Sequence, residues 1–256
     1  MQPETIDQLQ KVIEVQQNIL DIHPCLNKVF PIAIVEDGQF FIYDTAPSAK
    51  QYTFIKQAAT PMPIPQGVRA AFPLESYDNR TACVVTSEIF DSLDGYVTIF
   101  HEFIHCQQSE ICELKLKQAL GIARKAQAAQ DYMWELNYPF PYQAPEFIKC
   151  YNLFLGKMRS NDLGEVLEER KQLKNILSTD DYEYMVWQEW KEGFARFIEN
   201  QINRRLGLQE NHSGKEQPFT RVLFYEGGAN FINILALQEP QLTLDIEILF
   251  DRMLRG

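Results

Sequence analysis

The sequence predicts an α+β fold, with a small sheet near the amino terminus followed by a mainly helical remainder. The predicted strands, over 30–35, 40–43 and 81–86, all lie before residue 87. Helical periodicity dominates from residue 94 onward. Internal repeats and low-complexity tracts are both absent from the sequence. These observations predict two lobes, an α/β lobe over 1–115 and a helical lobe over 116–256.

Each element of the first lobe is predicted from its own pattern. Apolar residues recur at helical spacing until His23-Pro24 interrupts them. Asp37-Gly38 separates two β-prone runs and is typical of a tight hairpin. A stretch that contains four prolines is expected to be a long irregular loop. The predicted elements are thus an amphipathic helix, a hairpin, this loop and one further strand: 4–20, 30–43, 56–80 and 81–86.

Helical patterns then follow one another to the end of the chain. Asp94 is expected to cap the first of these helices, because a carboxylate can accept hydrogen bonds from free backbone N–H groups. That helix is apolar on nearly every side, as a buried helix should be. Thr243 is expected to cap the last helix. The later helices are predicted over 113–134, 146–158, 162–177, 180–206, 219–237 and 243–254.

Composition limits the classes of function and of compartment. The 256 residues include 24 Lys+Arg and 35 Asp+Glu, which gives a net charge of −11 without an acidic tail or a basic arm. Binding to nucleic acid through phosphate neutralisation is therefore not expected. No apolar run is long enough to span a membrane, and charged residues within 1–20 argue against a secretory signal. Five cysteines without a CxxC pair indicate reduced thiols, so we expect a cytoplasmic protein.

One motif carries strong chemical information: His101-Glu102-Phe103-Ile104-His105, or HExxH. On a helix the two histidines share one face, so both imidazoles can bind the same ion. Glu102 lies beside that ion, where it can accept a proton from a bound water. Zinc held by three protein ligands keeps a fourth position for water and lowers its pKa to about 7. The motif predicts a Zn²⁺ site with His101 and His105 as ligands and Glu102 as general base.

This motif resembles that of the zincin metallopeptidases, which are divided by their third zinc ligand. The metzincin extension is absent, since Gln108 and Ile111 stand where a glycine and a third histidine are needed. The aspzincin-type GTxD is absent as well. The resemblance is therefore to gluzincins, in which a glutamate on a second helix completes the site. It implies a zincin-like fold and a peptidase that uses a zinc-bound water activated by Glu102.

Several carboxylates compete for the place of third ligand. Asp131 and Glu135 follow His105 by 26 and 30 residues, near the separation in thermolysin-like gluzincins. Glu189 is a further alternative on the predicted helix 180–206. Glu192 begins Glu192-Gly193-Phe194-Ala195, which resembles the EGxA motif whose glutamate binds zinc in other gluzincin-like families. The resemblance favours Glu192, with Glu189 and Glu135 left open.

The predicted helix 180–206 can be divided into two faces. One face collects aromatic and apolar residues that should pack in a core: Trp187, Trp190, Phe194, Phe197 and Ile198. The opposite face collects Glu192 with Met185, Gln188, Arg196 and Glu199. Periodicity leaves open whether Glu192 meets solvent or a polar cleft. Gly193 and Ala195 favour the cleft, because small residues let a neighbouring helix approach closely.

Other residues are weighed against ordinary structural roles. Tyr225 resembles the tyrosine that follows EGxA in peptidase MA-like sequences and that stabilises the oxyanion, although it can equally be a core tyrosine. His212 lies in a polar loop, and His23 is expected to be structural. Cys106 is expected to be a buried thiol, because neighbours on a helix point about 100° apart. The zincin resemblance also implies that the strand containing Val84 is an edge strand that pairs with substrate.

The predicted function is that of a zinc-dependent peptidase acting on a peptide or protein substrate. The predicted ligands are His101, His105 and Glu192; Glu102 is the predicted general base, and Tyr225 supports the oxyanion. Two rival interpretations remain: a zincin-fold metal-binding or interaction protein without turnover, and a hydrolase of non-peptide amides or esters. Partners that are nucleic acids or membranes are not expected. The sequence leaves the oligomeric state, the cleavage specificity and the role of residues 1–80 undetermined.

Overall fold

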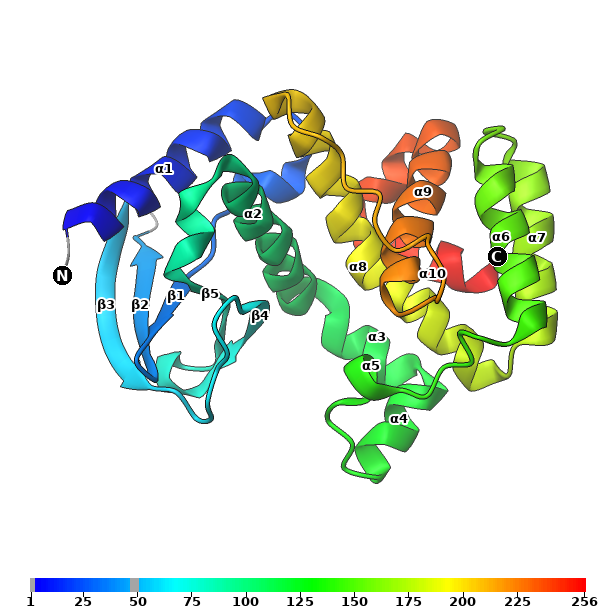
Figure 1. Ribbon diagram of the computed structural model, residues 1–256, viewed down its shortest axis with the longest axis horizontal. Helices are drawn as coiled ribbons and strands as arrows, with labels where there is room; N and C mark the ends of the chain where they lie inside the picture. Colours follow the sequence, from blue (N-terminus) through cyan, green and yellow to red (C-terminus); the bar gives the residue numbers. More distant parts are fainter. Residues whose placement is uncertain (1–2, 47–50) are drawn as a thin grey trace. The chain divides into compact units, whose positions relative to one another are not determined.

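The computed structural model describes residues 3–46 and 51–256 and has an α+β architecture, as predicted (Figure 1). Its residues group into two compact units. The first comprises residues 1–111 and 198–210, and the second comprises residues 112–197 and 211–256. The long helix α8 (Thr179–Leu206) contributes residues to both units. Within the described ranges, no helix is both long and apolar enough to cross a membrane.

The first unit is built on a five-stranded mixed sheet. Its strands are β1 (Ile32–Glu36), β2 (Gln39–Thr45), β3 (Tyr52–Ala59), β4 (Arg69–Leu74) and β5 (Arg80–Thr86). The spatial order is β3-β2-β1-β5-β4, in which only the β1–β5 pair is parallel. The β1–β2 hairpin is confirmed: Asp37 and Gly38 form its turn with φ of 47° and 70°, a conformation for which this dipeptide is suited.

The prediction of one irregular loop over 56–80 is wrong. Within this range, β3 covers residues 56–59, β4 covers 69–74 and a short 3₁₀ helix covers 75–77, so the irregular parts are residues 60–68 and 78–79. Pro73 lies inside β4 opposite Thr81, a position that proline tolerates because β4 is an edge of the sheet. Phe54 and Ile55 of β3 are about 41% exposed, so the alternation of buried and exposed residues that marks a strand is weak there.

The strand that contains Val84 is not an edge strand, which corrects the expectation drawn from the zincin resemblance. Strand β5 lies between β1 and β4 and pairs with both. The edges of the sheet are β3 and β4. Val84 therefore has both of its backbone sides committed to neighbouring strands, and only β4 or β3 offers free backbone groups along an edge.

Helix α2 (Leu93–Gln108), which carries the HExxH motif, packs against the sheet (Figure 1). The Phe103 ring lies 5.7 Å from that of Phe30. The cap of α2 is Ser92 rather than Asp94, because the Ser92 hydroxyl accepts a hydrogen bond from the Gly95 N–H at 3.1 Å. Helix α1 (Pro3–Ile19) is present as predicted, with an apolar face that buries Leu9, Val12 and Ile19.

Helices make up the second unit. They are α3 (Leu114–Ala119), α4 (Gly121–Ala128), α5 (Trp134–Asn137), α6 (Pro145–Met158), α7 (Leu163–Ile176), α9 (Val222–Gln238), α10 (Ile246–Arg255) and part of α8. The predicted helix over 113–134 is broken, since Leu120 has extended backbone and Gln130 a positive φ of 57°. The cap of α10 is Asp245 instead of Thr243, and it accepts hydrogen bonds from two backbone N–H groups.

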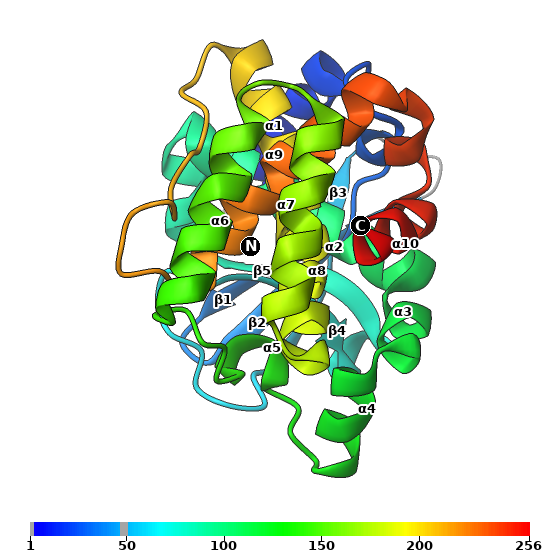
Figure 2. The ribbon, with the colours of Figure 1, turned by 90° about the vertical axis from the view of Figure 1, so that its right-hand side faces the viewer.

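The core of the second unit surrounds α8. Helices α6 and α7 lie side by side, and α9 packs against both of them (Figure 2). The predicted aromatic face of α8 is buried, with Trp187 and Trp190 at 0% exposure. Gly193 of α8 meets Gly228 of α9 so closely that a Cβ atom on Gly193 would lie 2.6 Å from the Gly228 Cα. This contact agrees with the expectation that small residues beside Glu192 admit a neighbouring helix.

Candidate metal centre

The histidines of the HExxH motif lie one turn apart on the same face of α2. His101 and His105 are about one-tenth exposed, and their Nε2 atoms are 3.2 Å apart. This spacing follows from the helix, in which residues i and i+4 are neighbours. Two nitrogens bound to one tetrahedral zinc ion, each at 2.0–2.1 Å, would be about 3.3–3.4 Å apart. The backbone of α2 thus places both imidazoles at a separation that fits a shared metal ion.

Both rings are held through their other nitrogen. His101 Nδ1 is 2.7 Å from Glu199 Oε2, and His105 Nδ1 is 2.9 Å from Gln108 Oε1. A carboxylate and an amide oxygen are acceptors, so each Nδ1 carries the proton and donates it. Each Nε2 then carries a lone pair, and the two lone pairs point toward each other. That arrangement is unfavourable for two neutral rings alone and is relieved by a cation between them.

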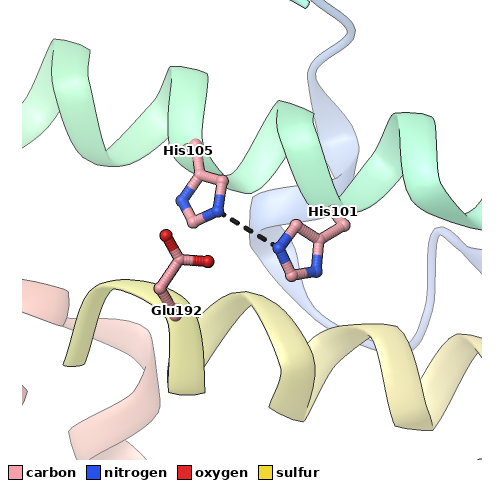
Figure 3. Close-up of side chains that lie close together, drawn as sticks. All are labelled: His101, His105 and Glu192. Carbon is pink, nitrogen blue, oxygen red and sulfur yellow. Dashed lines mark hydrogen bonds between the residues drawn. The ribbon is translucent and has the colours of Figure 1, made fainter. Parts of the chain in front are cut away.

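Glu192 lies on the same face of α8 as Glu199, two helical turns earlier. Seven residues rotate the chain by about 700°, so the two side chains nearly coincide around the axis. Ligand atoms of His101, His105 and Glu192 all lie within 4.8 Å of one another (Figure 3). No other group of three His, Cys, Asp or Glu residues in the described ranges meets this condition. The structure therefore brings together the three residues predicted to be ligands.

Residues of the second unit surround the Glu192 carboxylate. Arg221 Nη1 lies 3.6 Å from Glu192 Oε1, and the Tyr225 hydroxyl is hydrogen-bonded to the same carboxylate. Burial raises the pKa of Tyr225, and the neighbouring charge of Glu192 raises it further. The face of α8 that carries Glu192 is not solvated, since Met185, Gln188 and Arg196 are buried and Glu192 itself is only 14% exposed. Glu192 is therefore largely buried among polar side chains of the second unit.

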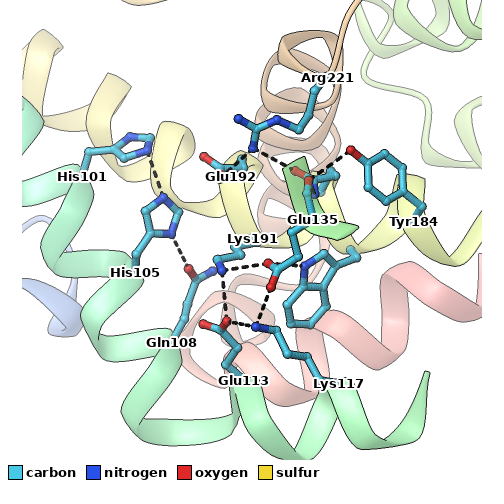
Figure 4. Close-up of polar contacts among 12 residues, drawn as sticks. His101, His105, Gln108, Glu113, Lys117, Glu135, Tyr184, Lys191, Glu192 and Arg221 are labelled. Carbon is cyan, nitrogen blue, oxygen red and sulfur yellow. Dashed lines mark hydrogen bonds and ion pairs between the residues drawn. The ribbon is translucent and has the colours of Figure 1, made fainter. Parts of the chain in front are cut away.

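Glu135, one of the alternatives for the third ligand, belongs to a charge network of the second unit instead (Figure 4). Its carboxylate lies 2.6 Å from Lys117 and 2.9 Å from Lys191, and it also accepts a hydrogen bond from the Trp187 indole N–H. Burial alone would raise the pKa of Glu135, but the two lysines lower it to about 2. Both of its oxygens are thus engaged by ammonium groups. Asp131 is exposed and accepts a hydrogen bond from the Met133 N–H.

Glu189, the other alternative, is fully buried in an ion pair. Its Oε2 lies 2.8 Å from Arg170 Nη1, and both side chains have 0% exposure. Its Oε1 accepts a hydrogen bond from the Tyr151 hydroxyl at 2.8 Å. The guanidinium of Arg170 in turn lies over the Phe231 ring at 4.5 Å. This carboxylate balances a buried positive charge, so it is committed to the core.

The predicted base is also buried. Glu102 is 6% exposed. Burial raises the pKa of the thiols of Cys83 and Cys106, and the nearby charge of Glu102 raises it further. On α2, Glu102 precedes Cys106 by four residues and so shares its face of the helix, next to the face of the two histidines. Cys106 has 0% exposure, which confirms the expectation of a buried thiol. A carboxylate at the edge of a dry core is well suited to proton transfer, because few waters compete for its proton.

The remaining predicted residues have distinct places. His23 accepts a hydrogen bond from the Cys25 N–H at 3.2 Å and so caps the short helix Pro24–Asn27, which agrees with a structural role. His212 Nδ1 lies 3.2 Å from Glu226 Oε1 and is half-exposed in the loop before α9. Tyr225 lies beside Glu192, as already described.

Two residues that orient the histidines, Gln108 and Glu199, were not assigned this role from the sequence. Glu199 falls on the predicted polar face of α8 together with Glu192, and that shared face was the available signal. Gln108 follows His105 by three residues, a spacing that places two side chains in contact on a helix. Neither residue type is diagnostic by itself, because glutamate and glutamine are common on helix surfaces.

Comparison with known proteins adds no identification. No family model matches the chain, and neither a curated protein nor a solved structure shows a significant match.

Proposed function

We propose that the chain is a zinc-dependent hydrolase whose substrates are peptides, with His101, His105 and Glu192 as zinc ligands. One observation carries the proposal: the Nδ1 atoms of both histidines are engaged by acceptors, while the two Nε2 atoms face each other at 3.2 Å. The group of ligand atoms that includes Glu192 supports it. Two neutral nitrogens and one carboxylate form a donor set typical of catalytic zinc sites.

The proposal extends to a zincin-like fold and to the cytoplasm as compartment. Support for the fold comes from α2, which carries HExxH and packs on a mixed sheet. Support for the compartment comes from the cysteines, all five of which are free thiols.

Each residue of the site has a separate task in the proposed reaction. When bound, zinc supplies Lewis acidity, which polarises a carbonyl group and makes water acidic near neutral pH. Glu102 takes a proton from the attacking water and passes it to the leaving amine. The Tyr225 hydroxyl donates a hydrogen bond to the oxyanion that develops on the substrate carbonyl. Glu199 and Gln108 fix the orientation of the two imidazoles.

Metal analysis of two matched variants tests the ligand set. Glu192→Gln removes the charge of the proposed ligand, whereas Glu135→Gln makes the same change in the neighbouring charge network. We expect near-stoichiometric zinc in the wild type and in Glu135→Gln after dialysis. In Glu192→Gln we expect zinc affinity to fall by more than about 100-fold, because a direct ligand contributes more than an outer hydrogen-bond partner.

The glutamine in Glu135→Gln can still accept a hydrogen bond from the Trp187 indole N–H, so the variant should fold. Circular dichroism of each protein confirms that it has folded. Equal zinc retention in both variants would show that Glu192 is not the third ligand.

The proposed site also makes a prediction for Glu199. Replacing Glu199 by glutamine weakens the hydrogen bond that orients His101 and is expected to lower zinc affinity by about 10- to 100-fold. Glu110→Gln is the control, because Glu110 is an exposed residue that forms an ion pair with Lys28 on the surface. Competition with a chelating dye measures both affinities. Identical affinities for the two variants would exclude an orienting role for Glu199.

A further inference from the structure

A group of hydrogen-bond donors in the second unit lies beside Glu192, and of its members only Tyr225 has a role in the proposed reaction. We call it the Arg221 cluster; it consists of Tyr142, Tyr184, Gln188, Arg221 and Tyr225. Figure 4 shows Tyr184 and Arg221 near Glu192. Arg221 Nη1 lies 3.5 Å from Gln188 Oε1, and the guanidinium lies 5.4 Å from the centre of the Tyr225 ring. The hydroxyls of Tyr142 and Tyr184 are 3.5 Å apart. The positive charge of Arg221 acts to lower the pKa of all three tyrosines, although burial raises each of them more.

The guanidinium of Arg221 is only loosely held by the protein. Among the described residues, its polar contacts are those with Gln188 and Glu192, at 3.5 and 3.6 Å, and both use the same nitrogen. A guanidinium carries five N–H groups, and charge-assisted bonds normally measure 2.7–2.9 Å. Nearby Lys191 shows the contrast, with carboxylates at 2.9 and 3.0 Å. Most of the donor capacity of Arg221 is therefore unused.

Arg196, a second arginine in contact with Tyr225, has a structural role and can be compared with Arg221. Arg196 lies over the Tyr225 ring at 5.2 Å, donates to the Ser213 carbonyl at 2.7 Å and is 4% exposed. Arg221 lies 5.4 Å from the same ring, yet its side chain is 28% exposed. Arg196 holds a loop in place, whereas Arg221 remains accessible to a molecule that binds next to Glu192.

We propose that Arg221 binds a carboxylate of the substrate close to the scissile bond. The inference rests on the proposed function, since it names the substrate class for the same site. The planar fork of arginine matches a carboxylate and binds it through two parallel hydrogen bonds. When Glu192 shares its charge with a metal ion, the attraction that holds Arg221 to it weakens. The substrate carboxylate then becomes the principal counter-charge of Arg221.

The chain's net charge sharpens this specificity. At −11, the protein repels acidic peptides over most of its surface. Beside the site, the accessible guanidinium of Arg221 attracts a carboxylate instead. Substrates should therefore be selected by a carboxylate at one defined position rather than by overall acidity. That carboxylate is supplied either by a free carboxyl terminus or by an Asp or Glu side chain.

Paired peptides test the inference. Each pair differs only in a Glu-to-Gln change at one position, or in a free against an amidated carboxyl terminus. We expect zinc-loaded wild type to prefer one acidic member by about 10- to 100-fold in kcat/KM, the effect of a hydrogen bond to a charged group. Arg221→Gln should remove this preference, and Arg221→Lys should restore part of it. Arg255→Gln, in which an 80% exposed arginine is replaced, should match the wild type. The preferred pair tells which source supplies the carboxylate.

A binding measurement separates this inference from the proposed function. Calorimetry with glutarate and its neutral diamide is carried out on zinc-loaded Glu102→Gln, with and without Arg221→Gln. We expect glutarate to bind and its neutral diamide not to bind. In the protein that also carries Arg221→Gln, the affinity for glutarate should be at least 10-fold lower. Arg221-dependent binding without cleavage of any peptide would leave the carboxylate site standing and refute the peptidase.

Two other outcomes would refute the role of Arg221. The first is cleavage of peptides by the wild type with no preference for a carboxylate. The second is a loss of zinc affinity in Arg221→Gln with equal losses for acidic and neutral peptides. That result would make Arg221 a residue that positions Glu192.

Discussion

Replacing Glu102 by glutamine is expected to lower the rate of peptide hydrolysis by about 10²- to 10⁴-fold while the protein keeps its zinc. The magnitude is that of a lost general base, because the amide cannot accept the proton of the attacking water. Zinc should remain because the proposed ligands His101, His105 and Glu192 are unchanged. The turnover number on a cleaved peptide and the zinc content by atomic emission are measured on the same preparation.

Glu168→Gln serves as the control for this experiment, since Glu168 is 61% exposed and lies on α7. It should match the wild type in both measurements. A Glu102→Gln protein that holds zinc and keeps full activity would rule out Glu102 as the base. Loss of activity together with zinc would show that Glu102 supports the metal instead.

Replacing Glu189 by alanine is expected to destabilise the second unit by about 3–5 kcal/mol, because it leaves the Arg170 guanidinium buried without a counter-charge. This is a large share of the stability of a typical domain, about 5–15 kcal/mol. All three tryptophans of the chain lie within residues 112–197. Their fluorescence during urea unfolding therefore reports on the second unit.

Two further proteins make the stability experiment decisive. In Arg170→Met combined with Glu189→Gln, the charge is gone and the Tyr151 hydroxyl keeps an acceptor, so most of the lost stability should return. Lys157→Ala breaks an exposed ion pair with Glu165 and should cost no more than about 1 kcal/mol. A loss in Glu189→Ala no greater than that of Lys157→Ala would mean that the buried pair contributes little.

Local patterns were sufficient to predict the fold class and the geometry of the histidine pair. Both depend on periodicity: the spacing i, i+4 places His101 and His105 together on any regular helix. The hairpin at Asp37-Gly38 was predictable for a similar reason, since its turn is determined by two adjacent residues. In contrast, β4 was missed because Pro73 lies within a strand at the edge of the sheet, where proline is tolerated. Strand β3 was missed because its exposed Phe54 and Ile55 weaken the alternation of buried and exposed residues.

The choice among the candidate carboxylates needed tertiary structure. Periodicity and spacing alone do not separate Glu135, Glu189 and Glu192, and the three carboxylates differ in the cations that surround them. Glu135 forms ion pairs with Lys117 and Lys191, which are 74 residues apart in the chain. Glu189 meets Arg170 from a different helix. Such long-range pairs produce no periodic pattern in the sequence. The sequence could therefore rank these residues as third ligand only through the resemblance of the EGxA motif.

The contact between Gly193 and Gly228 has a consequence for recognising distant relatives of this chain. A Cβ on Gly228 would lie 2.1 Å from the Glu189 carbonyl oxygen, so the main chains of α8 and α9 touch there and neither position has room for a methyl group. Apolar residues around them can drift in evolution, because a core tolerates exchanges that conserve volume. The two glycines cannot drift in this way. A search pattern of HExxH, then Glu-Gly, then a glycine 35 positions further on should therefore outlast similarity in the rest of the chain.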